Sequence, residues 1–438
     1  MAETMPLEPG PGVRSKLPAG IVDAGFASLA TFVAGLIAVT LLNDLDRGIY
    51  AVFFVAFNLG AIIAYQLVYV PAEIAAVSRP LNQRLTILDD SLRIGRLPAL
   101  GGSLVIVAAT VTTAPIADFS LSFPLTVSAL VVTYLSPTQD HLRRTLHIAH
   151  RPWHAAYMSI TQFVVTLTSI GVMWLIDVPV VWIPFGSLAI ANTLSMAFGR
   201  FLIYRDRHGA VAPGHVTFSE LSQQGRWLLF QAIIPALAAF ATANIITYLA
   251  SPEAMGYAEA ARIVAQPIMV AAGGLTSALR PRVMEAAMLR DLRVSKRVQS
   301  LYIGIVLLAT LVYIPIVGGD WAWNPLVAVV PAAYEIQYLV IAAIVSNVVM
   351  STQFLVVNEM MAANRARELT IAEALATPLR LIAATAAIFI GAFALPFSQI
   401  VNGFNVLVFL IYMYRQLYGI GPHRRVVPTE QETTVSPG

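Results

Sequence analysis

The chain has 438 residues, of which 58% are hydrophobic and 12% charged, and its formal net charge is only +3. This composition is more apolar than a soluble core of this length needs, so it excludes a soluble enzyme and indicates a protein solvated mostly by lipid. Cysteine is absent, which excludes disulfides, thiolate catalysis and cysteine-ligated metals. We therefore expect no cofactor, no metal and no nucleic-acid partner.

Twelve apolar stretches follow one another along the chain, each long enough to cross about 30 Å of hydrocarbon as a helix. We predict helices because lipid offers the backbone no hydrogen-bond partners. Pro71, Pro267 and Pro331 mark expected kinks or ends in the longest stretches. The predicted spans are 19–42, 49–78, 97–115, 121–140, 154–176, 179–200, 226–250, 256–282, 299–317, 325–358, 368–393 and 397–417.

Basic residues fall in every second connection and at both ends of the chain, whereas the other connections carry acidic residues such as Asp44, Asp118 and Asp320. Lysine and arginine in short loops remain on the cytoplasmic side. The pattern predicts a multi-pass protein with both termini in the cytoplasm and disordered tails at 1–18 and 421–438. Four histidines (His141, His147, His150, His154) share one basic connection, which we interpret as a hydrated cytoplasmic surface rather than a metal site.

The chain repeats itself after roughly 210 residues. The segment from Leu42 to Gly48 resembles that from Leu249 to Gly256, and Ala149-His-Arg resembles Ala363-Asn-Arg, at offsets of 208 and 214. Such parallel repeats are typical of transporters built from two related halves. We predict an N-terminal six-helix bundle at 19–202, a cytoplasmic linker at 203–225 and a C-terminal six-helix bundle at 226–420.

Two arginines lie inside predicted spans, Arg262 in the eighth and Arg380 in the eleventh. An arginine at a helix centre costs about 3 kcal/mol in membrane insertion, so each should face a cavity or a partner. A guanidinium suits a phosphate or diphosphate, which it grips in bidentate fashion. The alternative is local pairing with Glu259 and Glu373, which share the respective helix faces.

Polar residues form stripes at helical spacing in two other spans. Asn58, Tyr65 and Tyr69 recur in the second span, and Asn347 and Ser351 in the tenth. Such stripes either line a water-filled cavity, in which case these residues contact substrate, or bond neighbouring helices.

Five carboxylates are candidates for ion coupling. For Glu335 and Asp23, near the ends of their spans, ordinary contact with interfacial water is the alternative interpretation. The candidates are Asp23, Glu73, Glu259, Glu335 and Glu373.

The stretch from Gly256 through Arg262 to Pro267, the Leu279-Arg-Pro motif and the segment from Gln139 to Pro152 resemble the polysaccharide flippase branch of the multidrug/oligosaccharidyl-lipid/polysaccharide exporter superfamily. The resemblance implies two bundles in a V around a central cavity. It also implies alternating-access flipping of a polyprenyl-diphosphate-linked glycan to the outer leaflet of a bacterial plasma membrane, for cell-surface polysaccharide export. Arg262 would contact the diphosphate. The implied partners are the lipid-linked glycan, membrane lipid and polysaccharide synthesis enzymes.

Other functions compete with this interpretation. A cation-coupled multidrug antiporter of the same superfamily would need a carboxylate at mid-span. A lipid II flippase would carry cationic residues in the first two spans, where this chain has Asp23 and Glu73 and no arginine within the membrane. A glycan polymerase or ligase would need a substantial external loop, and the predicted external connections are under about ten residues. We therefore predict that the chain is not an enzyme. A non-transporting scaffold that keeps the fold is a further alternative.

Overall fold

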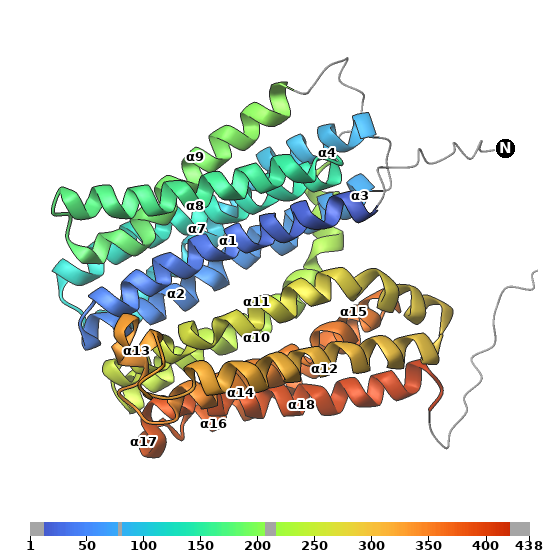
Figure 1. The fold of residues 1–438 in the computed structure, drawn as a ribbon. Helices are drawn as coiled ribbons and strands as arrows, with labels where there is room; N and C mark the ends of the chain where they lie inside the picture. The colour runs from blue at the N-terminus through green and yellow to red at the C-terminus, as the bar shows by residue number, and fades with distance from the viewer. Residues whose placement is uncertain (1–12, 78–80, 206–215, 421–438) are drawn as a thin grey trace, which may run out of the picture.

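The protein consists of two lobes of long helices. A computed structural model describes residues 13–77, 81–205 and 216–420, and these residues contain helices and no strands. We call the end of the molecule with the arginine-rich turns around Arg151 and Arg365 the basic end, and the opposite end, with Asp44 and Asp320, the acidic end. Figure 1 shows the lobes in contact at the acidic end and spreading apart toward the basic end.

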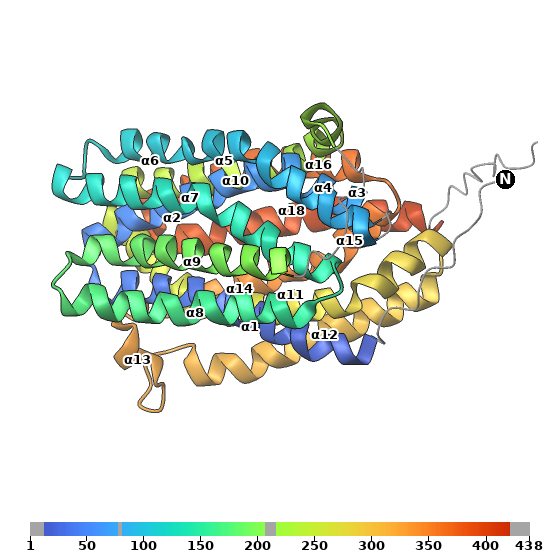
Figure 2. The same ribbon diagram turned by 90° about the horizontal axis from the view of Figure 1, so that it is seen from above.

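The first lobe (N-lobe) runs from α1 to α9. Figure 2 shows α7, α8 and α9 side by side along the length of the molecule. The helices are α1 (Val13–Leu41), α2 (Asp44–Ala64), the π-helix η1 (Tyr65–Tyr69), α3 (Val70–Val77), α4 (Leu81–Ile94), α5 (Arg96–Ser103), α6 (Val105–Thr113), α7 (Phe119–Ile148), α8 (Pro152–Leu175), η2 (Val180–Trp182) and α9 (Ile183–Arg205).

The second lobe (C-lobe) runs from α10 to α18 and meets the N-lobe through α10 and α11, which pack against α2. Its helices are α10 (Phe218–Leu249), α11 (Pro252–Leu289), α12 (Leu292–Val317), α13 (Leu326–Val329), η3 (Pro331–Ala333), α14 (Leu339–Ser351), α15 (Phe354–Ala362), α16 (Ala366–Ala384), α17 (Ala387–Ile390), η4 (Gly391–Phe393) and α18 (Ala394–Leu417).

The predicted all-helical membrane fold is confirmed. Among the described residues, ten helical segments are long and apolar enough to span a membrane. They coincide with ten of the twelve predicted spans. The remaining two predicted spans correspond to α11 and α16, the helices that carry Arg262 and Arg380.

Several boundaries differ from the sequence-based expectation. The basic connection 79–96 contains a helix, α4, and α1 begins at Val13 inside the predicted tail. The predicted tenth span is shorter than expected, because η3 begins at Pro331 and the membrane helix begins only at Leu339. The acidic-end connection 318–338 is consequently longer than the ten residues expected. The predicted tails at 1–12 and 421–438 and the linker centre at 206–215 lie outside the described residues.

The internal repeat is visible in matched turns at the basic end. His150 and Asn364 both have left-handed backbones, with φ of 61° and 59°. In each turn the following arginine donates its backbone N–H back to the helix, Arg151 to Leu146 O and Arg365 to Met360 O, both at 2.9 Å. This is the hydrogen-bond pattern of a Schellman helix end. Equivalent residues of the two halves therefore adopt one turn geometry.

The repeat also places two glycines against each other at the acidic end. A Cβ atom at Gly48 would lie 1.8 Å from the carbonyl oxygen of Pro252, and one at Gly256 would lie 3.0 Å from that of Asp44. The two contacts are equivalent under the 208-residue offset, so the lobes meet here with near-twofold symmetry. Tyr257 Oη donates to Asp44 Oδ2 at 2.9 Å across the same contact. We call these five residues the acidic-end seal.

Toward the basic end, the second span breaks into the π-helix η1 just before Pro71. Proline has no N–H to donate to a carbonyl in the preceding turn, which favours such a break. Gly225 of α10 packs against the backbone there, since a Cβ at Gly225 would lie 2.3 Å from Leu67 O and 2.8 Å from Gln66 O. The irregularity expected near Pro71 is therefore present as the π-helix η1, and η1 is a contact point between the lobes. The helix does not end at Pro267, because α11 is continuous from Pro252 to Leu289.

Candidate functional site

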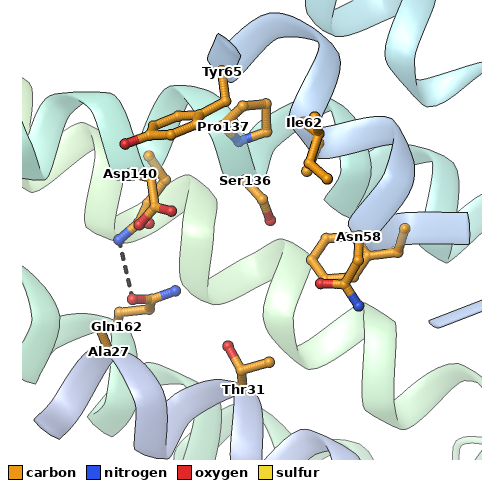
Figure 3. A pocket seen from close by; sticks show the side chains of 12 residues that line it. Ala27, Thr31, Asn58, Ile62, Tyr65, Ser136, Pro137, Asp140 and Gln162 are labelled. Carbon is orange, nitrogen blue, oxygen red and sulfur yellow. Dashed lines mark hydrogen bonds between the residues drawn. The ribbon is translucent and has the colours of Figure 1, made fainter. Parts of the chain in front are cut away.

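A polar cavity lies inside the N-lobe, between α1 and α2. These two helices barely touch each other, because α1 packs along α8 and α2 packs against α7 and the C-lobe. The cavity volume is about 320 Å³. Figure 3 shows side chains from four helices and η1 converging on it. Its lining is Ala27, Thr31, Phe57, Asn58, Ala61, Ile62, Tyr65, Ser136, Pro137, Gln139, Asp140 and Gln162.

A chain of amides and hydroxyls forms the wall of the cavity on α7, α8 and α9. Gln139 Nε2 donates to Gln162 Oε1 at 3.0 Å (Figure 3). Gln162 Nε2 donates to Asn192 Oδ1 at 2.8 Å, and Asn192 Nδ2 donates to Ser136 Oγ at 2.8 Å. These bonds fix the orientation of each amide, so the remaining donors and acceptors are presented in a set geometry.

A buried carboxylate lies on the basic side of this wall. Asp23 of α1 accepts hydrogen bonds from Arg143 Nη1 at 2.9 Å, His147 Nε2 at 2.7 Å and Ser159 Oγ at 2.5 Å. Arg143 also donates to Asp140 Oδ1 at 3.0 Å. A buried ion pair with this many hydrogen bonds holds its charges firmly, and here it ties α1 to α7 and α8.

A second charged cluster links η1, α3, α4 and α7. His141, fully buried, contacts Glu73 Oε1 through Nδ1 at 3.0 Å and Ser91 Oγ through Nε2 at 2.8 Å. Its ring stacks on Tyr69 with centroids 4.4 Å apart. The sequence-based interpretation of the His141–His154 stretch as a hydrated surface is wrong for His141, because α4 covers that face of α7.

Arg144, the residue after Arg143 on α7, lies against a residue that lines the cavity. Its guanidinium lies 4.7 Å from the centroid of the Tyr65 ring, and Tyr65 lines the cavity. The nearest oxygen of Glu73 is 3.9 Å away, and the Arg144 side chain is 44% exposed. Unlike Arg143, this guanidinium keeps donors available for a ligand.

Two of the predicted substrate contacts, Asn58 and Tyr65, line the cavity. Tyr69 lies behind the wall, where its hydroxyl is 3.0 Å from Thr138 Oγ1. The C-lobe stripe joins helices: Asn347 Nδ2 donates to Ala265 O at 3.0 Å, and the carbonyl of Ser351 accepts from Tyr302 Oη at 2.8 Å. Their role as substrate contacts remains a prediction.

Arg262 is engaged by its neighbour on α11. Its Nε and Nη2 donate to the two oxygens of Glu259 at 2.7 and 2.6 Å, and its guanidinium lies 5.1 Å from the Phe54 ring centroid across the lobe interface. The Arg262 side chain is 26% exposed, whereas Glu259 is fully buried. This is the geometry of the pairing alternative. A diphosphate would have to use the exposed edge of this guanidinium.

Arg380 is 5% exposed and donates to Pro235 O of α10 at 3.3 Å. Within the described part of the chain, its Nε and one oxygen of its electrostatic partner Glu373 have no hydrogen-bond partner. Glu335 is exposed on the acidic-end connection, outside the tenth membrane helix. None of these three residues lines the N-lobe cavity.

Sequence reasoning missed Gln139, Gln162, Asn192 and Arg144. The signal for one of them was present, because Ser159, Gln162, Thr166 and Ser169 recur at helical spacing on the buried face of α8. The same test that identified the stripe in the second span would have found it.

No family model matches the chain, and no curated protein matches it in sequence. Several solved structures resemble it in fold. An inward-facing multidrug resistance MATE family transporter of the MOP superfamily has a TM-score of 0.73 and 12% identity, with 92% of this chain and 98% of that chain covered. An outward-facing multidrug resistance MATE family transporter has a TM-score of 0.65 and 12% identity, with 93% of this chain and 95% of that chain covered.

A MOP superfamily transporter from Pyrococcus furiosus, described as having a binding pocket of reverse polarity that suggests a different function, has a TM-score of 0.64 and 13% identity, with 92% of this chain and 95% of that chain covered. At these identities the likeness shows the fold alone. The chain has the two-lobe helical fold of MOP superfamily transporters, and the finer likeness to the polysaccharide flippase branch rests on the sequence motifs.

Proposed function

We propose that this protein is an alternating-access transporter that carries a polyprenyl-diphosphate-linked glycan from the inner to the outer leaflet of a bacterial plasma membrane, for export of cell-surface polysaccharide. The observation that carries the proposal is the chemistry of the N-lobe cavity. Its polar lining is dominated by uncharged amides and hydroxyls, from Asn58, Gln139, Gln162, Ser136 and Thr31. Such groups both donate to and accept from sugar hydroxyls.

Aromatic side chains complete a surface suited to sugar. Tyr65 and Phe57 line the same cavity, and their rings offer apolar faces beside the amides. The cavity volume of about 320 Å³ is at the lower end of ligand pockets. It therefore suits one sugar at a time rather than a whole oligosaccharide.

The diphosphate needs a cation close to the sugar. Arg144 lies on Tyr65 at the cavity edge, and its partner Glu73 is 3.9 Å away, so a diphosphate can bind its free donors. Arg262 stays a second proposed contact, on the interface between the lobes. The lipid tail remains in the bilayer, because only the sugar and diphosphate are costly to place in hydrocarbon.

Orientation follows from the charges. Arginine-rich turns favour the cytoplasm, so we place the basic end and both termini there. The acidic-end seal then closes the outer side, and the structure represents the inward-facing state. The higher TM-score to an inward-facing transporter, 0.73 against 0.65 for an outward-facing one, supports this assignment. Synthesis enzymes that make the lipid-linked glycan on the cytoplasmic face are the proposed partners.

Depletion of the protein in its native cell tests the proposed function. We expect lipid-linked glycan to accumulate in the inner leaflet, where an impermeant glycan-oxidising reagent added to intact cells cannot reach it. Re-expression of the protein should restore the accessible pool. A lipid-linked glycan pool of unchanged size and accessibility would contradict the proposal.

The second candidate is a cation-coupled multidrug antiporter. One specific observation favours it: the cavity lining includes a carboxylate, Asp140, and one structural neighbour is the MATE multidrug transporter DinF-BH, solved as a complex with a ligand. That neighbour is 13% identical, with a TM-score of 0.62. Against it, Asp140 is already bonded to Arg143 at 3.0 Å, which lowers its attraction for a cationic drug. Extrusion of tetraphenylphosphonium from proteoliposomes, without any effect on glycan lipids, would favour this candidate.

A further inference from the structure

The contact between His141 and Glu73 contains one exchangeable proton. Ser91 Oγ donates its single hydrogen to Leu88 O at 2.7 Å, so it accepts from His141 Nε2 at 2.8 Å. Nε2 therefore carries a hydrogen. His141 Nδ1 and Glu73 Oε1 then face each other at 3.0 Å, and this contact holds only while one proton lies between them. While Ser91 keeps its bond to Leu88 O, loss of that proton leaves two lone pairs in repulsion.

A second histidine–carboxylate pair in the N-lobe, His147 with Asp23, lacks this property. His147 donates to Asp23, but Asp23 also receives Arg143 Nη1 at 2.9 Å and Ser159 Oγ at 2.5 Å. These two donors hold the Asp23 carboxylate in place whether or not His147 is charged. The guanidinium beside Glu73, that of Arg144, is 3.9 Å away. Of the two pairs, the His141–Glu73 contact is the one whose geometry depends on a proton.

Several charged and titratable groups surround the pair. On η1 they are Tyr65 and Tyr69, and on α7 they are Asp140, Arg143 and Arg144. On α4 Ser91 is the hydrogen-bond partner of His141, and the same helix carries Arg84, Asp89, Asp90 and Arg93. Arg96 of α5 and Arg200 of α9 act on Tyr69. Glu73 retains 12% of its side-chain exposure, so protons reach the pair from the solvent side.

The pair is mechanically connected to the interface between the lobes. Glu73 lies on α3, directly after the π-helix η1, and Tyr69 of η1 stacks on His141. The other side of η1 presents Gln66 O and Leu67 O to Gly225 of the C-lobe. If the His141–Glu73 contact opens, α3 keeps only the longer Arg144–Glu73 ion pair to α7, and the surface on which α10 rests can move.

We propose that the His141–Glu73 pair binds the proton that couples to the transport cycle, and that its protonation holds η1 in the position that α10 contacts at the basic end. The coupling role rests on the proposed transport function. Proton binding by the pair and the movement of α10 are independent of the proposed transport function. Buried histidine and glutamate side chains within membrane-spanning segments are typical proton-relay sites in transporters.

Two substitutions should fix the pair in opposite states. Glu73→Gln places an amide N–H opposite His141 Nδ1, so the contact persists at every pH. His141→Phe keeps the stacking on Tyr69 but removes both hydrogen bonds, so the contact is open at every pH. If the pair had only a structural role, Glu73→Gln and His141→Phe would produce the same defect. His147→Gln is the matched control, because Arg143 and Ser159 still hold Asp23.

The experiment measures the distance between the lobes in full-length protein in lipid nanodiscs. The chain has no cysteine, so Leu97→Cys on α5 and Met288→Cys on α11 provide two unique spin-label sites, both exposed, on opposite lobes. We expect the populations of two distances to change about tenfold between about pH 5 and pH 8 in the parent and in His147→Gln. Glu73→Gln should stay at the low-pH distance and His141→Phe at the high-pH distance.

Three results would overturn the proposal: a parent protein with no pH-dependent shift, a Glu73→Gln variant that still responds, or two variants that stop at the same distance. Thermal unfolding of each variant shows whether it folds. The measurement needs no glycan lipid. A transporter with a different substrate would therefore fail the depletion test while this result stands.

Discussion

The two lobes share their turns but differ in their polar chemistry. The turns at His150 and Asn364 have the same backbone geometry, and the helix caps Asn43 and Ser251 occupy equivalent positions. Yet the cavity and the Asp23 and His141 clusters lie in the N-lobe, whereas in the C-lobe Asn347 and Arg262 bond to other groups of the same lobe. The two halves share one backbone frame, and the binding role that we propose rests on the side chains of the N-lobe alone.

The acidic-end seal is a contact to which both halves contribute equivalent residues. We expect substitutions there to have the largest effect on transport. Gly48→Ala puts a methyl group 1.8 Å from Pro252 O, so the lobes cannot meet. We expect the transport rate to fall by about 100-fold, which corresponds to a destabilisation of the inward-facing state by roughly 3 kcal/mol. Flux into proteoliposomes and spin-label distances across the acidic end would measure it.

Gly304→Ala on α12 is the matched control, because a Cβ there meets nothing within 4 Å. Both changes favour the helix to the same extent, so the difference isolates the contact. Gly256→Ala, at 3.0 Å from Asp44 O, should have an intermediate effect. Equal activity of the Gly48 and Gly304 variants would show that the lobes do not need this contact.

The Asp23 cluster should dominate the stability of the N-lobe. Asp23→Asn leaves Arg143 and His147 facing a neutral amide in a buried site, and removing one partner of a buried pair costs about 3–5 kcal/mol. We expect a large drop in unfolding temperature in detergent. Glu368→Gln, which removes the exposed partner of Arg365 in the C-lobe, is the comparison and should cost less than about 1 kcal/mol. Similar melting of the two variants would mean that burial does not set the strength of these pairs.

A cavity amide in the N-lobe and a helix-packing amide in the C-lobe should have different effects on substrate binding and on stability. Gln162→Ala removes a cavity amide, and we expect transport to fall about tenfold, the equivalent of one hydrogen bond of about 1.4 kcal/mol to the sugar. Asn347→Ala breaks a bond between α14 and α11 and should lower the unfolding free energy by about 1 kcal/mol with little change in substrate affinity. The result that contradicts this comparison is an affinity loss in the Asn347 variant alone.

Exchange of Glu259 and Arg262 should have the smallest effect on transport. It distinguishes a structural ion pair from a contact between Arg262 and the diphosphate. If the pair is only structural, the exchanged protein should transport at nearly the parent rate, because the ion pair can re-form one turn away. If Arg262 contacts diphosphate, Arg262→Ala and the exchanged protein should both lose about threefold or more, while expression persists. Transport assays on the two variants, side by side, distinguish these outcomes.

The membrane helices could be predicted from the sequence because lipid leaves little choice. Long apolar stretches must be helical, and the charges between them mark their ends. Boundaries near the basic end were harder. Helix α4 and the first turns of α10 are more polar, and the Thr217 capping box rather than hydropathy starts α10 at Phe218.

The candidate site was only half visible in the sequence. Asn58 and Tyr65 came from a stripe on one helix, but Gln162 and Arg144 act through contacts with other helices. Spacing along one helix shows which residues share a face, and it does not show which face meets which neighbour. For the same reason, the sequence could not distinguish a diphosphate contact of Arg262 from local pairing with Glu259.

The sequence by itself therefore determined the membrane fold, the order of the spans and the duplicated halves, because these depend on hydropathy, local turns and the charges beside each helix. Only the tertiary structure decided that Gly48 meets Pro252, that Asp23 meets Arg143 and that His141 lies between Glu73 and Ser91. Those contacts join residues many positions apart, and the packing of whole helices, not any local pattern, brings them within hydrogen-bond distance.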